Sequence, residues 1–313
     1  MSALLEIAVA AGEAILVHYG KKIPVDKKAD DSPLTIADRA AHGVIFEALS
    51  AEFPEIPILS EEGEIPDFEI RKNWSRFFLV DPLDGTKEFI KQTGEFTVNI
   101  GLVEDGIPTV GVVYAPATGL TYAAEPGRAG KIVLKKMEDG NTGALGAFGA
   151  ACAERSPEGD MSGSEGGKWP RKSKPLAAGR QHPAIAELLT PISCGIFAEG
   201  ANPTIVASRD HAGPEVQKLV DRYPSAEFRS MGSSLKFSLV AEGAADIYLR
   251  DVPTMEWDTA AAHAIVNAAG GEIRCLDGSP LLYNKEILKN PAIVTLRPGA
   301  SALRGSTRVT SEE

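Results

Sequence analysis

Two aspartates follow a short apolar segment in FFLVDPLDGTKEFI, residues 77–90. The apolar run predicts a buried strand, and Asp81 and Asp84 come where that strand ends. Sheets of α/β proteins commonly bind ligands at the carboxyl ends of their strands. We therefore expect both carboxylates at the edge of a sheet, where they could do chemistry. The alternative is a simple turn around Pro82, since Asp favours turns.

Other acidic residues stand at the ends of predicted elements. Glu61 and Glu62 follow the apolar segment IPILS, Asp258 opens a predicted helix, and Asp38 follows Thr35 by three residues. Each position has an ordinary explanation: a solvated loop pair, a helix N-cap and a capping-box partner, respectively. Because all of these acids stand at the ends of elements, however, the folded chain could bring them together in one cleft. Each close pair would repel by about 4 kcal/mol at roughly 4 Å and an effective dielectric near 20, so such a cluster needs cations.

The chain offers oxygen ligands for such cations. Mg²⁺ prefers carboxylates and carbonyls, such as that of Leu83, and the sequence presents no thiolate or paired-histidine set. Two magnesium ions suit phosphoryl hydrolysis, because they activate a water and stabilise charge on the attacking and leaving oxygens. Gly85 and Thr86 begin a further predicted helix whose N–H groups could bind phosphate. A covalent mechanism, as in D-x-D-G-T phosphatases, ranks lower because the two acids here are spaced by three residues.

The composition favours a protein that acts on small molecules. The 313 residues are 43% hydrophobic, enough for one large domain or two ordinary ones. A net charge of −11 argues against broad binding to nucleic-acid polymers or anionic membranes. The three cysteines suggest no disulfide framework, and no signal segment or run of 18 apolar residues occurs. We expect a cytoplasmic protein, with peripheral attachment at the inner membrane left open.

The first part of the chain is predicted to form an α+β domain, residues 1–136, that carries the metal site. Apolar residues at helical spacing predict two helices, and alternating β-rich segments predict strands and an antiparallel meander. The helices are expected over 4–18 and 35–53, the strands over 56–60 and 76–80, and the meander over 96–126, with turns at Asp105-Gly106 and Thr118-Gly119.

The rest of the chain divides by composition. From 137 to 174 it is rich in Gly, Ser, Glu and Lys, so 137–200 is predicted to be an insertion and connecting segment, partly mobile. Alternating strands and helices then predict an α/β domain, residues 201–313, that carries substrate-recognition residues. Strands are expected over 204–208, 226–230, 245–250 and 272–276, and helices over 213–223, 233–243 and 258–271.

Three acidic motifs occur in an order and spacing that resemble a known family. They are LSEE (59–62), DPLDGTKEFI (81–90) and WDTAAAHAIVNAAGG (257–271), and they are similar to those of the lithium-sensitive, magnesium-dependent phosphatases of the inositol monophosphatase family. The segments KKADDSPLTIADRAAH, GVVYAP and GSSLKFSLVAEG resemble the branch of that family that acts on nucleotide bisphosphates. The resemblance covers most of the chain outside 137–201. It implies an α/β fold, a layered αβαβα sandwich of the inositol monophosphatase and fructose-1,6-bisphosphatase type.

The same resemblance implies an activity. The chain is expected to hydrolyse the 3'-phosphate of adenosine 3',5'-bisphosphate to give AMP and phosphate, which clears a by-product of sulfate assimilation. Its partner is then a small nucleotide bisphosphate, and the oligomeric state is left open. Two alternatives are an inositol monophosphatase, against which GSSLKF and Arg250 count, and a non-catalytic nucleotide- or metal-binding regulatory protein. The set of Asp38, Thr86 and Glu61 counts against the second.

Matching positions imply roles for individual residues. One Mg²⁺ would be held by Glu61, Asp81 and the Leu83 carbonyl, and another by Asp81, Asp84 and Asp258, so that Asp81 bridges the two ions. A third, weakly held ion is also considered. The catalytic residues would be Asp38, Glu61 and Thr86, with the Thr86 hydroxyl and its partner Asp38 orienting and deprotonating the water.

Further matching positions imply contacts with the nucleotide and its non-reacting phosphate. These substrate-binding residues are Gly85, Thr86, His211, Gly232, Ser233, Lys236 and Arg250. Positive charge at Lys236 and Arg250 makes chemical sense, because a second phosphate needs a charge partner. The glycine-rich insertion and the segment DVPTMEWD before Asp258 depart from the family pattern, so the resemblance does not assign base recognition there.

Overall fold

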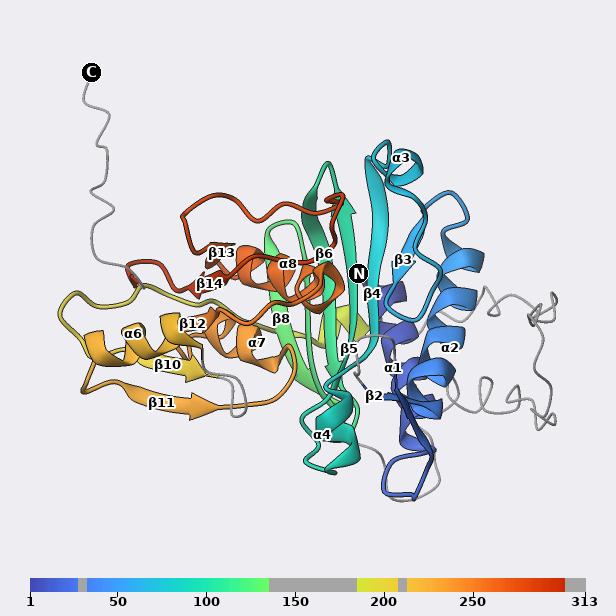
Figure 1. Ribbon diagram of the computed structural model, residues 1–313, viewed down its shortest axis with the longest axis horizontal. Helices are drawn as coiled ribbons and strands as arrows, with labels where there is room; N and C mark the ends of the chain where they lie inside the picture. Colours follow the sequence, from blue (N-terminus) through green and yellow to red (C-terminus); the bar gives the residue numbers. More distant parts are fainter. Residues whose placement is uncertain (28–32, 135–184, 208–212, 302–313) are drawn as a thin grey trace.

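The structure is a computed structural model that describes residues 1–27, 33–134, 185–207 and 213–301 (Figure 1). The predicted insertion at 137–174 and the predicted substrate residue His211 lie outside these ranges. A seven-stranded sheet forms the larger part of the framework. Its strands, neighbours in this order, are β3 (Ile58–Ser60), β4 (Arg76–Asp84), β5 (Thr97–Glu104), β6 (Ile107–Ala115), β7 (Leu120–Glu125), β8 (Arg128–Val133) and β9 (Thr190–Pro191).

Both faces of this sheet are buried, which explains why its strands are apolar almost throughout. Successive side chains of β4 point to opposite faces. Phe77 and Leu79 pack in the core that contains helices α7 (Leu235–Ala241) and α8 (Ala260–Ala268). Phe78 and Val80 pack in the core that contains α1 (Ser2–Leu16) and α2 (Ile36–Glu52). The sheet is antiparallel except between β3 and β4, which run parallel and so end at the same edge.

A smaller sheet follows on the other side of α7 and α8. Its order is β11 (Glu227–Ser230), β10 (Thr204–Ala207), β12 (Ile247–Arg250), β14 (Ile293–Leu296) and β13 (Glu272–Cys275). Helix α6 (Pro214–Arg222) packs on its far face through Val216 and Leu219. The three cores therefore give the layers helices, sheet, helices, sheet and helix, and Figure 1 shows α1 and α2 on one side of the large sheet and α7 and α8 on the other. The predicted αβαβα sandwich is confirmed.

The remaining elements are short. They are the hairpin strands β1 (Val25–Lys27) and β2 (Pro33–Thr35), helices α3 (Phe68–Arg71) and α4 (Thr86–Ile90), and the single turns η1 (Ile185–Leu188) and η2 (Glu256–Asp258). Strand β14 was not predicted, and it changes the smaller sheet. It runs antiparallel to both β12 and β13, so that sheet is mixed, with only β11, β10 and β12 parallel. The division into two domains stays a prediction; β9, within the predicted connecting segment, pairs with β8.

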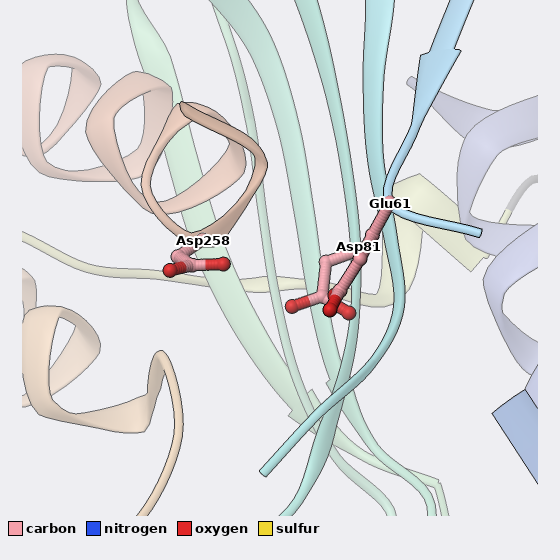
Figure 2. A group of neighbouring side chains, drawn as sticks. All are labelled: Glu61, Asp81 and Asp258. Atoms are coloured by element: carbon pink, nitrogen blue, oxygen red, sulfur yellow. The ribbon is translucent and has the colours of Figure 1, made fainter. Parts of the chain in front are cut away.

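Two glycines allow α8 to approach the large sheet closely. A Cβ at Gly111 of β6 would lie 2.1 Å from the main-chain oxygen of Ala261, and one at Gly101 of β5 would lie 2.9 Å from its nitrogen. Neither distance is compatible with a side chain, so only glycine lets the backbones meet here. The close packing fixes the first turn of α8 against the sheet. Asp258, two residues before that helix, is thereby held near the ends of β3 and β4 (Figure 2).

Candidate active site

An irregularity in β4 brings Asp81 and Asp84 together. In the pairing with β5, Asp81 lies opposite Asn99 and Asp84 opposite Thr97, so β4 contains one extra residue between them. In a regular strand, residues three apart point to opposite faces, and an inserted residue restores them to the same side. The carboxylate of Asp81 also accepts a hydrogen bond from the Leu83 N–H at 3.0 Å. The DPLD segment thus directs both acids toward one site.

Glu61 and Asp258 complete the acidic cluster. Glu61 directly follows β3, and its N–H donates to the Val80 oxygen of the neighbouring strand at 3.0 Å. Asp258 ends η2, and its carboxylate accepts from the Met255 N–H at 2.8 Å. One carboxylate oxygen each from Glu61, Asp81 and Asp258 lie within 4.8 Å of one another. Figure 2 shows Glu61 and Asp81 side by side, with Asp258 facing them from the other side.

Without a cation, the carboxylates of this cluster repel one another in a buried environment. Burial raises the pKa of Asp81 well above its usual value, and the nearby charges of Glu61, Asp84 and Asp258 raise it further. Burial, Asp84 and Glu61 likewise raise the pKa of Asp258, against a smaller lowering by the Met255 N–H. Closely placed, desolvated carboxylates of this kind are typical of a metal site. The donor set is all oxygen, which fits a hard cation such as Mg²⁺.

Asp38 serves two structural roles at once. Its Oδ2 accepts from the N–H of Thr35 at 2.8 Å and from the Thr35 hydroxyl at 2.6 Å, which makes the capping box at the start of α2. Its Oδ1 accepts from the hydroxyl of Thr86 at 3.2 Å. The capping explanation and the predicted pairing with Thr86 are therefore compatible. Asp38 is only 1% exposed, and its hydrogen bond with Thr86 connects it to the half-buried start of α4.

A pocket of about 120 Å³ adjoins the acidic cluster. Acidic and basic side chains both line it, and its lining residues are Asp84, Gly85, Lys87, Glu88, Ser233, Ser234, Lys236, Phe237, Tyr248, Arg250, Thr254 and Asp258. Burial lowers the pKa of Lys236 to about 8, against opposing effects of Asp84, Glu88 and Glu95. Four predicted substrate residues, Gly85, Ser233, Lys236 and Arg250, thus lie beside predicted metal ligands.

Ser233 has features that indicate a ligand. Its φ is +48°, in the left-handed region that side chains other than glycine rarely adopt. Its hydroxyl is buried and has no hydrogen-bond partner within the described part of the chain. Backbone strain together with an unsatisfied buried hydroxyl often marks a binding position. Gly232, its neighbour, is not among the pocket-lining residues; its N–H donates to Glu95 Oε2 at 2.8 Å.

Several residues at the site were not predicted from the sequence. Ser234 donates to Asp84 Oδ2 at 2.7 Å, and Asn99 donates to Ser234 at 2.9 Å. Tyr248 and Thr254 line the pocket from β12 and the loop that follows it. The signal for Asn99 was its place in an otherwise apolar strand, because a buried amide needs a partner. No comparable signal distinguished Tyr248 from an ordinary core residue.

The chain matches known proteins over nearly its whole length. Residues 1–142 and 199–301 match the model of the inositol monophosphatase family. The 3'(2'),5'-bisphosphate nucleotidase CysQ of Shigella flexneri is 38% identical over 91% of this chain and 95% of its own length. The protein of that name in Escherichia coli K12 is 39% identical over the same shares.

Solved structures agree with the sequence matches. The crystal structure of CysQ from Bacteroides thetaiotaomicron, described as a bacterial member of the inositol monophosphatase family, has 37% identity and a TM-score of 0.70. The match covers 96% of this chain and 97% of that one. In the part of the chain that the structure describes, no helix is long and apolar enough to cross a bilayer. The predicted resemblance is confirmed: this chain belongs to the inositol monophosphatase family.

Proposed function

We propose that the chain is a Mg²⁺-dependent 3'(2'),5'-bisphosphate nucleotidase, which removes the 3'-phosphate of adenosine 3',5'-bisphosphate and leaves AMP. The observation that carries this proposal is a pocket that Asp84 and Asp258 line together with Lys236 and Arg250. A substrate with two phosphates needs both kinds of group, one to hold metal at the reacting phosphate and one to bind the other phosphate. The names of the similar bacterial nucleotidases support the same substrate, and clearing this by-product would serve sulfate assimilation.

Enzymes of this family depend on metal ions, and the acidic cluster suits one. We infer that Glu61, Asp81 and the carbonyl of Leu83 hold one Mg²⁺, and that Asp81, Asp84 and Asp258 hold a second; a third, weaker ion is part of the proposal. When bound, the ions supply Lewis-acid stabilisation of the phosphate and lower the pKa of a coordinated water. The raised pKa values of Asp81 and Asp258 support this assignment, because a cation would relieve the repulsion that raises them.

Thr86 and Asp38 would take the proton from the attacking water, and we place Glu61 beside them in the catalytic set. The Thr86 hydroxyl donates to Asp38 Oδ1, which leaves its lone pairs free to accept from a water. Asp38 can accept the proton that Thr86 passes on, while its other oxygen stays fixed by Thr35. The capping box therefore keeps the base in one orientation, as general-base catalysis requires.

The remaining phosphate and the nucleotide would occupy the other end of the pocket. Lys236 and Arg250 supply positive charge there, and the unpartnered hydroxyl of Ser233 can donate to a phosphate oxygen. Gly85, in the left-handed region with φ of +89°, immediately precedes α4 and could offer its N–H with that of Thr86. Gly232 and His211 stay predicted substrate contacts, and His211 lies outside the described residues.

A substrate panel tests the proposal. Release of phosphate is measured from adenosine 3',5'-bisphosphate, inositol 1-phosphate and fructose 1,6-bisphosphate, each with Mg²⁺ and with EDTA. The proposal predicts the highest kcat/KM for the nucleotide and loss of turnover in EDTA. Faster hydrolysis of inositol 1-phosphate would support the alternative within the family, that the chain is an inositol monophosphatase. Binding without turnover of any of the three would support a regulatory role.

A further inference from the structure

The hydroxyl of Ser234 lies between two of the proposed metal ligands. Its Oγ is 2.7 Å from Oδ2 of Asp84 and 2.9 Å from the main-chain oxygen of Asp258. Asn99 donates to the same Oγ from its side-chain nitrogen, at 2.9 Å. Ser234 and Asn99 are each 1% exposed, so these contacts have no competition from solvent.

Each member of this arrangement comes from a different element. Asn99 belongs to β5 of the large sheet, Ser234 immediately precedes α7, and Asp258 ends η2. Asp84 is the last residue of β4. Four different segments of the chain therefore meet at one hydroxyl group.

The chemistry of the groups fixes which way the hydrogen bonds run. A serine hydroxyl has one proton to donate, and the charged carboxylate of Asp84 is its nearer acceptor. The amide of Asn99 must present its nitrogen to Ser234, because its nitrogen also lies 3.4 Å from Oδ2 of Asp84. The reverse orientation would place the amide oxygen against the carboxylate. Asn99 thus supplies the donor that leaves the Ser234 proton free for Asp84.

We propose that Ser234, oriented by Asn99, is a positioning residue that sets the geometry of Asp84 relative to Asp258 and thereby the Mg²⁺ affinity of the site. The inference rests on the proposed function, since it takes Asp84 and Asp258 as metal ligands. Partners that hydrogen-bond a ligating carboxylate orient it, and their loss commonly costs 10- to 100-fold in metal affinity. Neither residue contacts the metal or the water in this account.

The chain contains a matched control on the same helix. Ser238 of α7 is also 1% exposed, and its hydroxyl has no hydrogen-bond partner among the described residues. Ser238→Ala therefore removes the same atoms from a similar buried environment without touching Asp84. Ser234→Thr retains a hydroxyl at the site and serves as the conservative variant.

The test is a calorimetric Mg²⁺ titration of the full chain without any nucleotide. We expect Ser234→Ala to weaken Mg²⁺ binding by about 10- to 100-fold and Asn99→Ala by a smaller factor, whereas Ser238→Ala leaves it within about twofold and Ser234→Thr restores much of it. In assays with nucleotide, the Mg²⁺ concentration for half-maximal rate should rise by a similar factor, with less change in kcat at saturating Mg²⁺. Thermal unfolding in EDTA verifies that each variant is folded.

The Mg²⁺ titrations distinguish a failure of the proposed metal site from a failure of the positioning role of Ser234. If the unmodified chain binds no Mg²⁺, the metal site and the inference are both wrong. If the unmodified chain binds Mg²⁺ and Ser234→Ala binds it as tightly as Ser238→Ala does, only the positioning role is wrong. Should Ser234→Ala fail to fold, Asn99→Ala decides the matter, because unchanged Mg²⁺ affinity in that variant would also overturn the role.

Discussion

The substitution Asp81→Asn should stabilise the metal-free chain while destroying its response to Mg²⁺. Asp81 is buried at the centre of the acidic cluster, and its carboxylate oxygen accepts a hydrogen bond from Leu83 that an asparagine oxygen can also accept. The change therefore removes one negative charge with little loss of local structure. In an ordinary buried ion pair such a change would cost stability, but here the partners carry the same sign.

The magnitude follows from the geometry of the cluster. With carboxylate oxygens of Glu61, Asp81 and Asp258 within 4.8 Å of one another, each charged pair repels by at least about 3.5 kcal/mol at an effective dielectric near 20. Protonation already relieves part of this repulsion, as the raised pKa of Asp81 indicates. We therefore expect Asp81→Asn to raise the free energy of unfolding in EDTA by a net 1–3 kcal/mol, roughly, at pH 8.

The pH dependence has a definite sign. The pKa values of Asp81 and Asp258 in the folded chain lie above the ordinary value of 3.8. At a pH between 3.8 and these raised pKa values, the folded chain therefore binds more protons than the unfolded chain. The free energy of unfolding in EDTA should thus rise as pH falls from 8 through the raised pKa values toward about 4. Asp81→Asn should make this rise shallower, so its advantage over the unmodified chain should shrink at low pH.

The assay is urea unfolding of both proteins in EDTA and in Mg²⁺, at pH 8 and pH 5.5. Mg²⁺ at about 100 times its Kd should stabilise the unmodified chain by about 2.7 kcal/mol and the variant by much less. The reasoning is refuted if Asp81→Asn is clearly less stable than the unmodified chain in EDTA at pH 8. It is equally refuted if Mg²⁺ stabilises both proteins to the same extent.

Three further predictions concern the proton path, the second phosphate and helix α8, which follows Asp258. Thr86→Val should lower kcat by about 10²- to 10⁴-fold with Mg²⁺ affinity unchanged, and Thr86→Ser should recover most of the rate; equal rates in both variants would contradict the role of the hydroxyl. Lys236→Met should lower kcat/KM for adenosine 3',5'-bisphosphate by about 10- to 100-fold. It should lower kcat/KM for 3'-AMP much less, because 3'-AMP lacks the second phosphate. In the unmodified chain, kcat/KM for the bisphosphate should fall as pH rises through about 8, where Lys236 loses its charge, and the variant should lack this decline. Gly111→Ala should lower the free energy of unfolding by about 1–3 kcal/mol or more, because its Cβ would lie 2.1 Å from the Ala261 oxygen. Gly43→Ala, which has open space around its Cβ, should not lower it. Equal stability of the two variants in thermal unfolding would contradict the packing of α8.

Much of the fold could be predicted because its periodicity is strong. The helices over 36–52 and 260–268 show clear apolar spacing, and the long strands of the meander alternate between residues that face the two cores. Strand β14 was missed although it is no shorter than β13, which was expected. Its antiparallel place between β12 and β13 depends on tertiary contacts, which local pattern does not report.

The acidic site was predictable for a different reason. Acids at the ends of apolar strands stand out, and the parallel pairing of β3 and β4 brings Glu61 beside Asp81. The extra residue that puts Asp84 on the same side is a matter of strand register, which the sequence did not reveal. The contacts of Ser234 with Asp84 and Asn99 join segments more than a hundred residues apart, so only the folded chain shows them.

The identity of the departing phosphate tests the central claim most directly. Adenosine 3',5'-bisphosphate is hydrolysed in ¹⁸O-labelled water with Mg²⁺, and the products are followed by phosphorus NMR. With Lys236 and Arg250 holding the other phosphate, the account predicts adenosine 5'-monophosphate as the nucleotide product and the label only in free phosphate. Adenosine 3'-monophosphate as the product, or label in the nucleotide, would contradict it.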